Sequence, residues 1–74
     1  MAHNKITNKI PSWLTPNGEI VACTEKIKVM QQNLEELQQM AQDTFEDGIL
    51  MGVDHLQLKE FMLNLINNLH NPYK

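Results

Sequence analysis

The 74 residues of this chain are 42% hydrophobic and 20% charged, and six Lys against nine Asp and Glu give a net charge of −3. A chain of this length forms one small domain that buries only about 60% of its unfolded surface, so we expect support from a partner. No residue is Arg and positive charge is not clustered, which disfavours phosphate and nucleic-acid binding.

Cysteine content and hydropathy predict the cellular compartment of the protein. The single cysteine, Cys23, cannot close an internal disulfide, and it excludes a zinc or iron-sulfur site built from several cysteines. The start of the chain contains no apolar segment of signal-peptide length, and no stretch approaches the roughly 18 apolar residues of a membrane span. The sequence therefore predicts a cytoplasmic protein without a membrane segment.

Residues 1–23 are predicted to form an N-terminal arm, because Pro11 and Pro16 interrupt any helical pattern there. The run Thr15-Pro16-Asn17-Gly18 has the residues of a tight turn, since Pro presets the first turn position and Asn and Gly tolerate a positive φ. We expect a turn or short hairpin that lies against a helical surface, because two strands alone are marginal in water. Its apolar residues are Trp13, Leu14, Ile20 and Val21.

A long amphipathic helix is predicted over residues 25–51, with Thr24 as its N-cap. Apolar residues recur there at alternating spacings of three and four, which is typical of a helix that packs along one side. Acidic and amide side chains occupy mainly the opposite side. The predicted seam, which is also the predicted dimer interface, consists of Ile27, Met30, Leu34, Leu37 and Ala41.

A second helix is predicted over residues 55–69, after a tight connection at Gly52. Glycine accommodates a left-handed helix end, and Asp54 with Gln57 has the D-x-x-Q spacing of a capping box. Asn71-Pro72 ends this helix. Its apolar residues, again at helical spacing, are Leu58, Phe61, Met62, Leu65, Ile66 and Leu69.

The two predicted helices differ in length, at about 40 Å and about 22 Å for the usual rise per residue. If they fold back as a hairpin, the half of the first helix that bears Ile27 and Leu34 extends past the second with its apolar stripe uncovered. A second copy packing antiparallel would cover that stripe in a two-fold four-helix bundle. The predicted fold is therefore all-α, a long-helix/short-helix hairpin (residues 24–74) behind an extended arm, assembled as a homodimer.

Residues 48–58 resemble the helix-turn-helix family, in which a small residue is followed four and five positions later by Gly-Val and then by an aliphatic residue. Phe61 continues the match. The resemblance implies that the second helix, from Asp54, enters the major groove of DNA. The acidic residues before the turn and the presence of Lys59 as the one cation of that helix disfavour this role. A DNA-binding regulator is therefore the alternative to a role in protein contacts.

The predicted first helix is acidic, because residues 25–51 contain two Lys and six Asp and Glu, a net charge of −4. Such a surface either recruits a basic partner or keeps the protein in solution. Trp on an arm either anchors the arm or marks an interface, where Trp is frequent. The candidate partner contacts are Trp13, Glu35, Glu36, Asp43, Glu46 and Asp47.

No catalytic residue, cofactor or metal site is predicted. The carboxylates of the first helix lack the Glu-x-x-His pairs that di-iron bundles use. Cys23 precedes a helix start, where a thiolate is favoured, but no second cysteine accompanies it. The sequence therefore predicts a non-catalytic interaction module, an adaptor or regulator that works through protein contacts.

Overall fold

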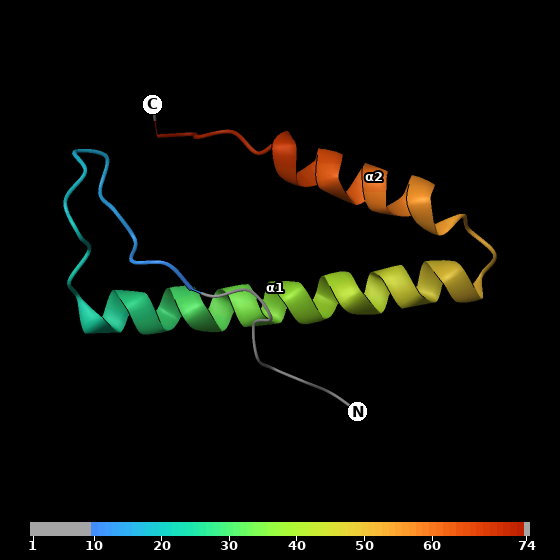
Figure 1. Ribbon diagram of the computed structural model, residues 1–74, viewed down its shortest axis with the longest axis horizontal. Helices are drawn as coiled ribbons and strands as arrows, with labels where there is room; N and C mark the ends of the chain where they lie inside the picture. Colours follow the sequence, from blue (N-terminus) through green and yellow to red (C-terminus); the bar gives the residue numbers. More distant parts are fainter. Residues whose placement is uncertain (1–9, 74) are drawn as a thin grey trace. The chain divides into compact units, whose positions relative to one another are not determined.

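The computed structural model describes residues 10–73, which contain two helices, α1 (Thr24–Leu50) and α2 (His55–Asn67), as Figure 1 shows. The prediction of an all-α chain with two helices is confirmed. The first nine residues of the predicted arm lie outside the described residues. The chain divides into two compact units, Met1–Met40 and Ala41–Lys74, and α1 runs through both.

A short antiparallel pairing precedes α1 in the first unit. Leu14 and Ile20 form an isolated bridge, and the Val21 N–H donates to the Trp13 carbonyl oxygen at 2.8 Å. Neighbouring residues of an extended chain point to opposite faces, so Leu14 and Ile20 share one face and Trp13 and Val21 share the other. The first pair is exposed and the second is half-buried, so this hairpin has one covered and one uncovered apolar face.

The hairpin is closed by a turn at Thr15-Pro16-Asn17-Gly18. The Thr15 carbonyl oxygen accepts from the Gly18 N–H at 2.9 Å, and the Thr15 N–H donates to the Glu19 carbonyl oxygen at 2.7 Å. Gly18 has a φ of 85°, and no non-glycine residue of the described range has a positive φ. The geometry is that of a type I turn followed by a left-handed glycine, so Gly18 alone supplies the unusual backbone conformation.

α1 begins at Thr24, one residue before the predicted start. The Ile27 N–H donates to the Cys23 carbonyl oxygen at 3.1 Å, which is the first hydrogen bond of the helix. The prediction of Thr24 as the N-cap is therefore wrong, because Thr24 already lies in the first turn and Cys23 flanks it. Glu25 lies in the same turn, where a carboxylate favours the positive end of the helix dipole.

α1 ends one residue earlier than predicted, in a Schellman motif that leaves Met51 outside the helix. The Val53 N–H donates to the Gly48 carbonyl oxygen at 2.9 Å, and the Gly52 N–H donates to the Ile49 carbonyl oxygen at 3.0 Å. Gly52 has a φ of 91°, as the motif requires at the residue after the cap. The predicted helix stop at Gly52 is therefore confirmed.

α2 is capped at its N-terminus by Asp54, as the D-x-x-Q spacing predicts. Asp54 has an extended backbone, with a φ of −60° and a ψ of 127°, and its Oδ2 accepts from the Gln57 N–H at 2.9 Å. One of the otherwise unpaired amide groups of the first turn is satisfied in this way.

Replacing Asp54 with Ala removes this acceptor and is expected to lower the free energy of unfolding by about 1 kcal/mol. Thermal melting followed by circular dichroism measures the loss. The matched control is Asp54→Asn, which keeps a side-chain oxygen and should melt close to the parent protein. Equal melting of the Ala and Asn variants would contradict the capping role.

α2 ends at Asn67, two residues before the predicted end. The Asn68 N–H donates to the carbonyl oxygens of Asn64 and Ile66, and the Leu69 N–H donates to the Ile66 carbonyl oxygen at 3.2 Å. The chain therefore tightens into a turn at Asn68, because Asn competes with helical hydrogen bonding and favours helix ends. Leu69 lies just past the helix in this turn.

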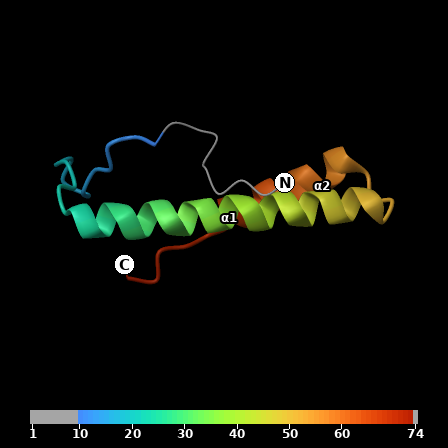
Figure 2. The ribbon, with the colours of Figure 1, turned by 90° about the horizontal axis from the view of Figure 1, so that it is seen from below.

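In the second unit, α2 turns back beside the last turns of α1, as Figures 1 and 2 both show. Gly48 is buried at this contact, and a Cβ built on it would run into the Leu58 side chain. The Lys59 Nζ lies 5.9 Å from the centroid of the Phe45 ring, within cation–π range. The absence of a side chain at Gly48 therefore lets Leu58 approach the α1 backbone, which is consistent with a helical hairpin.

Within residues 10–73, no apolar side chain is buried. Seventeen large apolar side chains of this range are at least 42% exposed, and they come from the hairpin, from both helices, from the turn between them and from the segment after α2. Neither described helix combines the length and the apolar character that a membrane crossing requires. The predicted homodimeric four-helix bundle goes beyond the single chain and stays a prediction.

Candidate protein-contact surface

The predicted seam of α1 is partly exposed. Ile27, Leu34 and Ala41 are half-buried, whereas Met30 and Leu37 are 46% and 48% exposed. Residues spaced by three and four share one side of a helix, so these five side chains form a continuous apolar stripe that we call the α1 stripe. The α1 stripe is the surface where sequence analysis predicts a second copy to pack.

The apolar side of α1 is wider than the sequence analysis predicts. Val29 and Met40 are both exposed and are more accessible than any residue of the α1 stripe. They are eleven residues apart, which places them almost in line along the helix, next to the stripe. Val29 and Met40 do not belong to the alternating spacing of three and four that predicts the seam, and their spacing of eleven is the sequence signal for a second apolar line.

α2 contributes a second apolar surface that was predicted only as the packing side of that helix. Leu58 and Met62 are half-buried, while half or more of the surface of each of the other four predicted residues is exposed. These four are Phe61, Leu65, Ile66 and Leu69. Leu56 and Leu63 are also exposed, on the other side of the helix by their spacing. The apolar residues of α2 therefore lie on more than one side of the helix.

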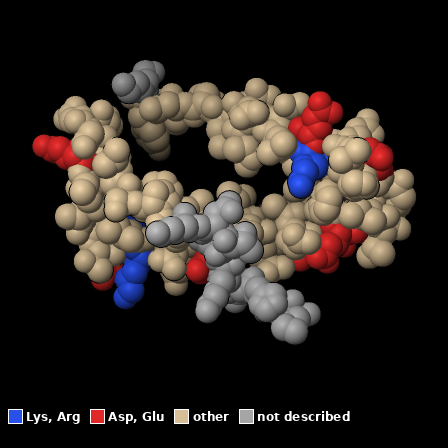
Figure 3. Space-filling view, viewed as in Figure 1, with Lys and Arg blue, Asp and Glu red and all other residues tan. Residues whose placement is uncertain are grey.

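The predicted acidic contacts lie on α1 outside its apolar stripe. Glu35 is half-buried and accepts from the Gln31 side-chain amide at 3.4 Å, and Glu46 is exposed and accepts from the Gln42 amide at 2.7 Å. Amide–carboxylate pairs at this spacing stabilise a helix by a few tenths of a kcal/mol. The remaining candidates, all exposed, are Glu36, Asp43 and Asp47. Figure 3 shows acidic atoms gathered over the second half of α1.

Trp13, the predicted contact on the arm, is half-buried on the covered face of the hairpin. Its indole Nε1 is inaccessible and has no hydrogen-bond partner among residues 10–73. A buried N–H without an acceptor costs free energy, so the apolar ring accounts for the position of Trp13 in the described fold. Trp13 as an anchor of the arm and Trp13 as a partner contact both stay predictions.

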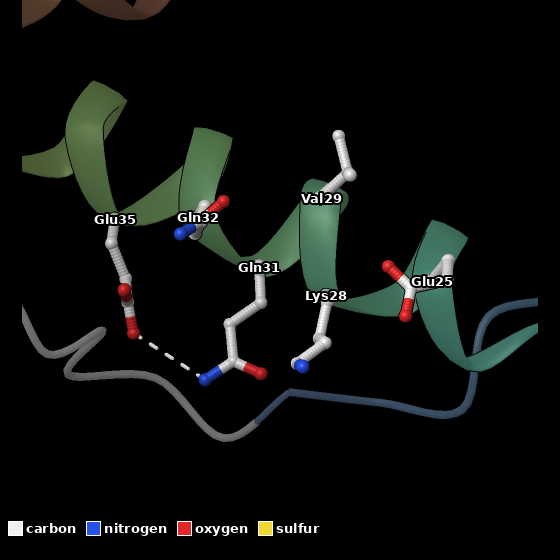
Figure 4. A pocket seen from close by; sticks show the side chains of 6 residues that line it. All are labelled: Glu25, Lys28, Val29, Gln31, Gln32 and Glu35. Atoms are coloured by element: carbon white, nitrogen blue, oxygen red, sulfur yellow. Dashed lines mark hydrogen bonds between the residues drawn. The ribbon is translucent and has the colours of Figure 1, made fainter.

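A polar pocket lies on the first turns of α1, and Glu35, one of the predicted partner contacts, is among its lining residues. It measures about 410 Å³ and is lined by Glu25, Lys28, Val29, Gln31, Gln32 and Glu35. Figure 4 shows the Lys28, Gln31 and Glu35 side chains extending to the same side of the helix, whereas Val29 points away. Charges of both signs lie on one exposed helix surface, an arrangement that helix surfaces commonly have.

The described residues contain no group of three or more His, Cys, Asp and Glu side chains placed to hold a metal ion. Cys23 is exposed at the start of α1.

The residues that resemble a helix-turn-helix span the last turn of α1, the left-handed turn at Gly52 and the first turn of α2. Lys59, the one Lys or Arg of α2, lies over the Phe45 ring.

Comparison with known proteins adds no relative. No family model, curated protein or solved structure matches this chain.

Proposed function

We propose that the chain is a non-catalytic interaction module that assembles as a homodimer, with the α1 stripe inside a two-fold four-helix bundle. The observation that carries the proposal is the exposure of seventeen large apolar side chains in a described range that buries none. Apolar surface is stabilised by about 25 cal/mol per Å² when it leaves water, and large exposed patches mark contact sites. We therefore expect a partner to bury these side chains and so to complete a hydrophobic core.

The distribution of charge on α1 supports a second copy as that partner. The apolar stripe and the six acidic residues of residues 25–51 fall on different sides of the helix by their spacing. Two copies can therefore bring their stripes together while their carboxylates stay in water. This segregation favours the two-fold, self-complementary contact that is most frequent among homo-oligomers.

The proposed adaptor role uses the surface that the dimer leaves in water. Glu36, Asp43 and Asp47 are exposed, and an acidic surface attracts basic partners over the range of the Debye length. We place this role in the cytoplasm, where a single thiol stays reduced. DNA binding is not part of the proposal, because α2 carries Lys59 as its one Lys or Arg.

Sedimentation equilibrium of the purified chain tests the proposal. The expected mass is twice the 8.6 kDa of one chain, with a helical circular dichroism spectrum under the same conditions. A mass of one chain at the highest concentration reached, with the same helical content, would contradict the homodimer.

A further inference from the structure

The turn that closes the hairpin contains a chemically labile pair of residues, Asn17 and Gly18. Asn17 is the one Asn of the sequence that a Gly follows, and both residues are exposed. Glycine has no side chain to shield its backbone nitrogen, so this nitrogen can reach the side-chain carbonyl carbon of the residue before it. An Asn in this position is therefore prone to lose its side-chain amide.

This deamidation needs water as its one co-reactant. The Gly18 nitrogen attacks Cγ of Asn17, so the N–Cγ bond forms, the Cγ–Nδ2 bond breaks, and ammonia leaves with the proton of the Gly18 amide. Water then opens the cyclic imide at one of its two carbonyl carbons. Opening at Cγ gives aspartate in an unchanged main chain. Opening at the main-chain carbonyl carbon gives isoaspartate, whose main chain runs through Cβ and Cγ and is one carbon longer.

The closed turn holds the Gly18 nitrogen back from this reaction. Its N–H donates to the Thr15 carbonyl oxygen at 2.9 Å. The nitrogen attacks only after it loses this proton, so the hydrogen bond must open first, as it must for amide hydrogen exchange. Asn17 is the third residue of a type I turn, and closure of the imide ring requires its backbone to rotate away from that conformation. The rate of deamidation therefore depends on how often the hairpin opens.

The two products differ in whether they can rebuild the hairpin. The register of a hairpin depends on the length of its loop, and the turn from Thr15 to Gly18 places Leu14 opposite Ile20. Aspartate keeps that length and is a usual turn residue. Isoaspartate lengthens the main chain inside the turn, so the turn hydrogen bonds and the pairing of Leu14 with Ile20 cannot form together.

We propose that Asn17 is a site of spontaneous deamidation, that the closed hairpin protects it, and that its conversion to isoaspartate opens the hairpin irreversibly. The hydrogen bond between the Val21 N–H and the Trp13 carbonyl oxygen is lost with the pairing. The hairpin is therefore a device that opens in one direction. This proposal does not depend on the homodimer, because all of its contacts lie within one chain.

The first test measures the rate of deamidation at Asn17 by peptide mapping and mass spectrometry, at one temperature and neutral pH. The parent chain in buffer is expected to react at least about tenfold more slowly than the same chain unfolded in guanidinium chloride. Asn33, which precedes a Leu, is the internal control and should stay intact in both samples. Equal rates in the folded and unfolded chain would contradict the protection, and an intact Asn17 in the unfolded chain would exclude the site.

A variant that weakens the turn without changing the labile pair separates structure from local chemistry. The Thr15 Oγ1 accepts from the Glu19 N–H at 3.2 Å, and Thr15→Ala removes this acceptor. We expect deamidation to be several-fold faster in the folded variant and unchanged in the unfolded one. The matched control is Thr15→Ser, which keeps the hydroxyl and should react like the parent chain. An unchanged rate in folded Thr15→Ala would show that the turn does not control the reaction.

The last test compares the two products, which have the same mass and are separated by chromatography. Trp13 is the one Trp of the chain and is half-buried on the hairpin, so its fluorescence reports the opening. The isoaspartate product is expected to emit at longer wavelength than the parent chain, whereas Asn17→Asp should emit like the parent. Parent-like emission from the isoaspartate product would contradict the opening of the hairpin.

Discussion

Replacing Leu37 with Glu is expected to convert the homodimer into single chains. Leu37 lies in the α1 stripe and is 48% exposed in the described chain, so the proposed dimer is what buries it. A carboxylate without a partner in that contact costs about 3 kcal/mol, which corresponds to a dissociation constant more than 100-fold higher. Sedimentation equilibrium over a range of concentrations measures the change.

The matched control for Leu37→Glu is Gln32→Glu, which adds the same charge to the same helix on the side opposite the stripe. Gln32 is exposed, so this variant should keep the dimer and lose only a few tenths of a kcal/mol to like charges along the helix. Equal weakening by the two variants would show that added charge, and not its place in the α1 stripe, separates the chains.

Replacing Gly48 with Leu is expected to lower the free energy of unfolding by about 1–3 kcal/mol, the usual cost of overpacking. Gly48 is buried, and its missing side chain leaves the space that Leu58 occupies. A larger side chain there must push α2 away from the last turns of α1. Thermal or urea unfolding followed by circular dichroism measures the loss.

Two further variants assign that loss to the Leu58 contact. Gly48→Ala should be close to neutral, because the end of the Leu58 side chain can shift and Ala gains about 1 kcal/mol over Gly in a helix. In the double variant Gly48→Leu/Leu58→Ala, the added side chain fills the vacated space, so the two changes should cost less together than the sum of their separate costs. Strict additivity would contradict the close approach of Leu58 to Gly48.

Helix positions and helix ends were predictable because their causes are local. The alternating spacing from Ile27 to Ala41 predicts the side of α1 that is apolar, and Asp54 with Gln57 predicts the start of α2. The boundary errors are one or two residues. They arise where hydrogen bonding extends or shortens a helix by part of a turn, as the Cys23 carbonyl oxygen does for α1.

The extent of exposure was not predictable from periodicity. Spacing shows that Phe61 and Leu58 belong to one apolar side, but not that Leu58 is half-buried and Phe61 exposed. That difference depends on the tight approach of Leu58 to Gly48, a contact between residues ten apart. Partner identity is also absent from a single sequence, because an apolar stripe has the same pattern whatever covers it.

The concentration dependence of the thermal midpoint tests most directly whether this fold depends on a second copy. Association with a partner copy stabilises the folded chain by mass action, so the midpoint of an obligate dimer rises with protein concentration. Across a 100-fold range, recorded by circular dichroism, we predict a midpoint that increases steadily with concentration. A cooperative transition at one fixed temperature across that range would show that the single chain is stable with its apolar side chains in water, and would contradict the proposed assembly.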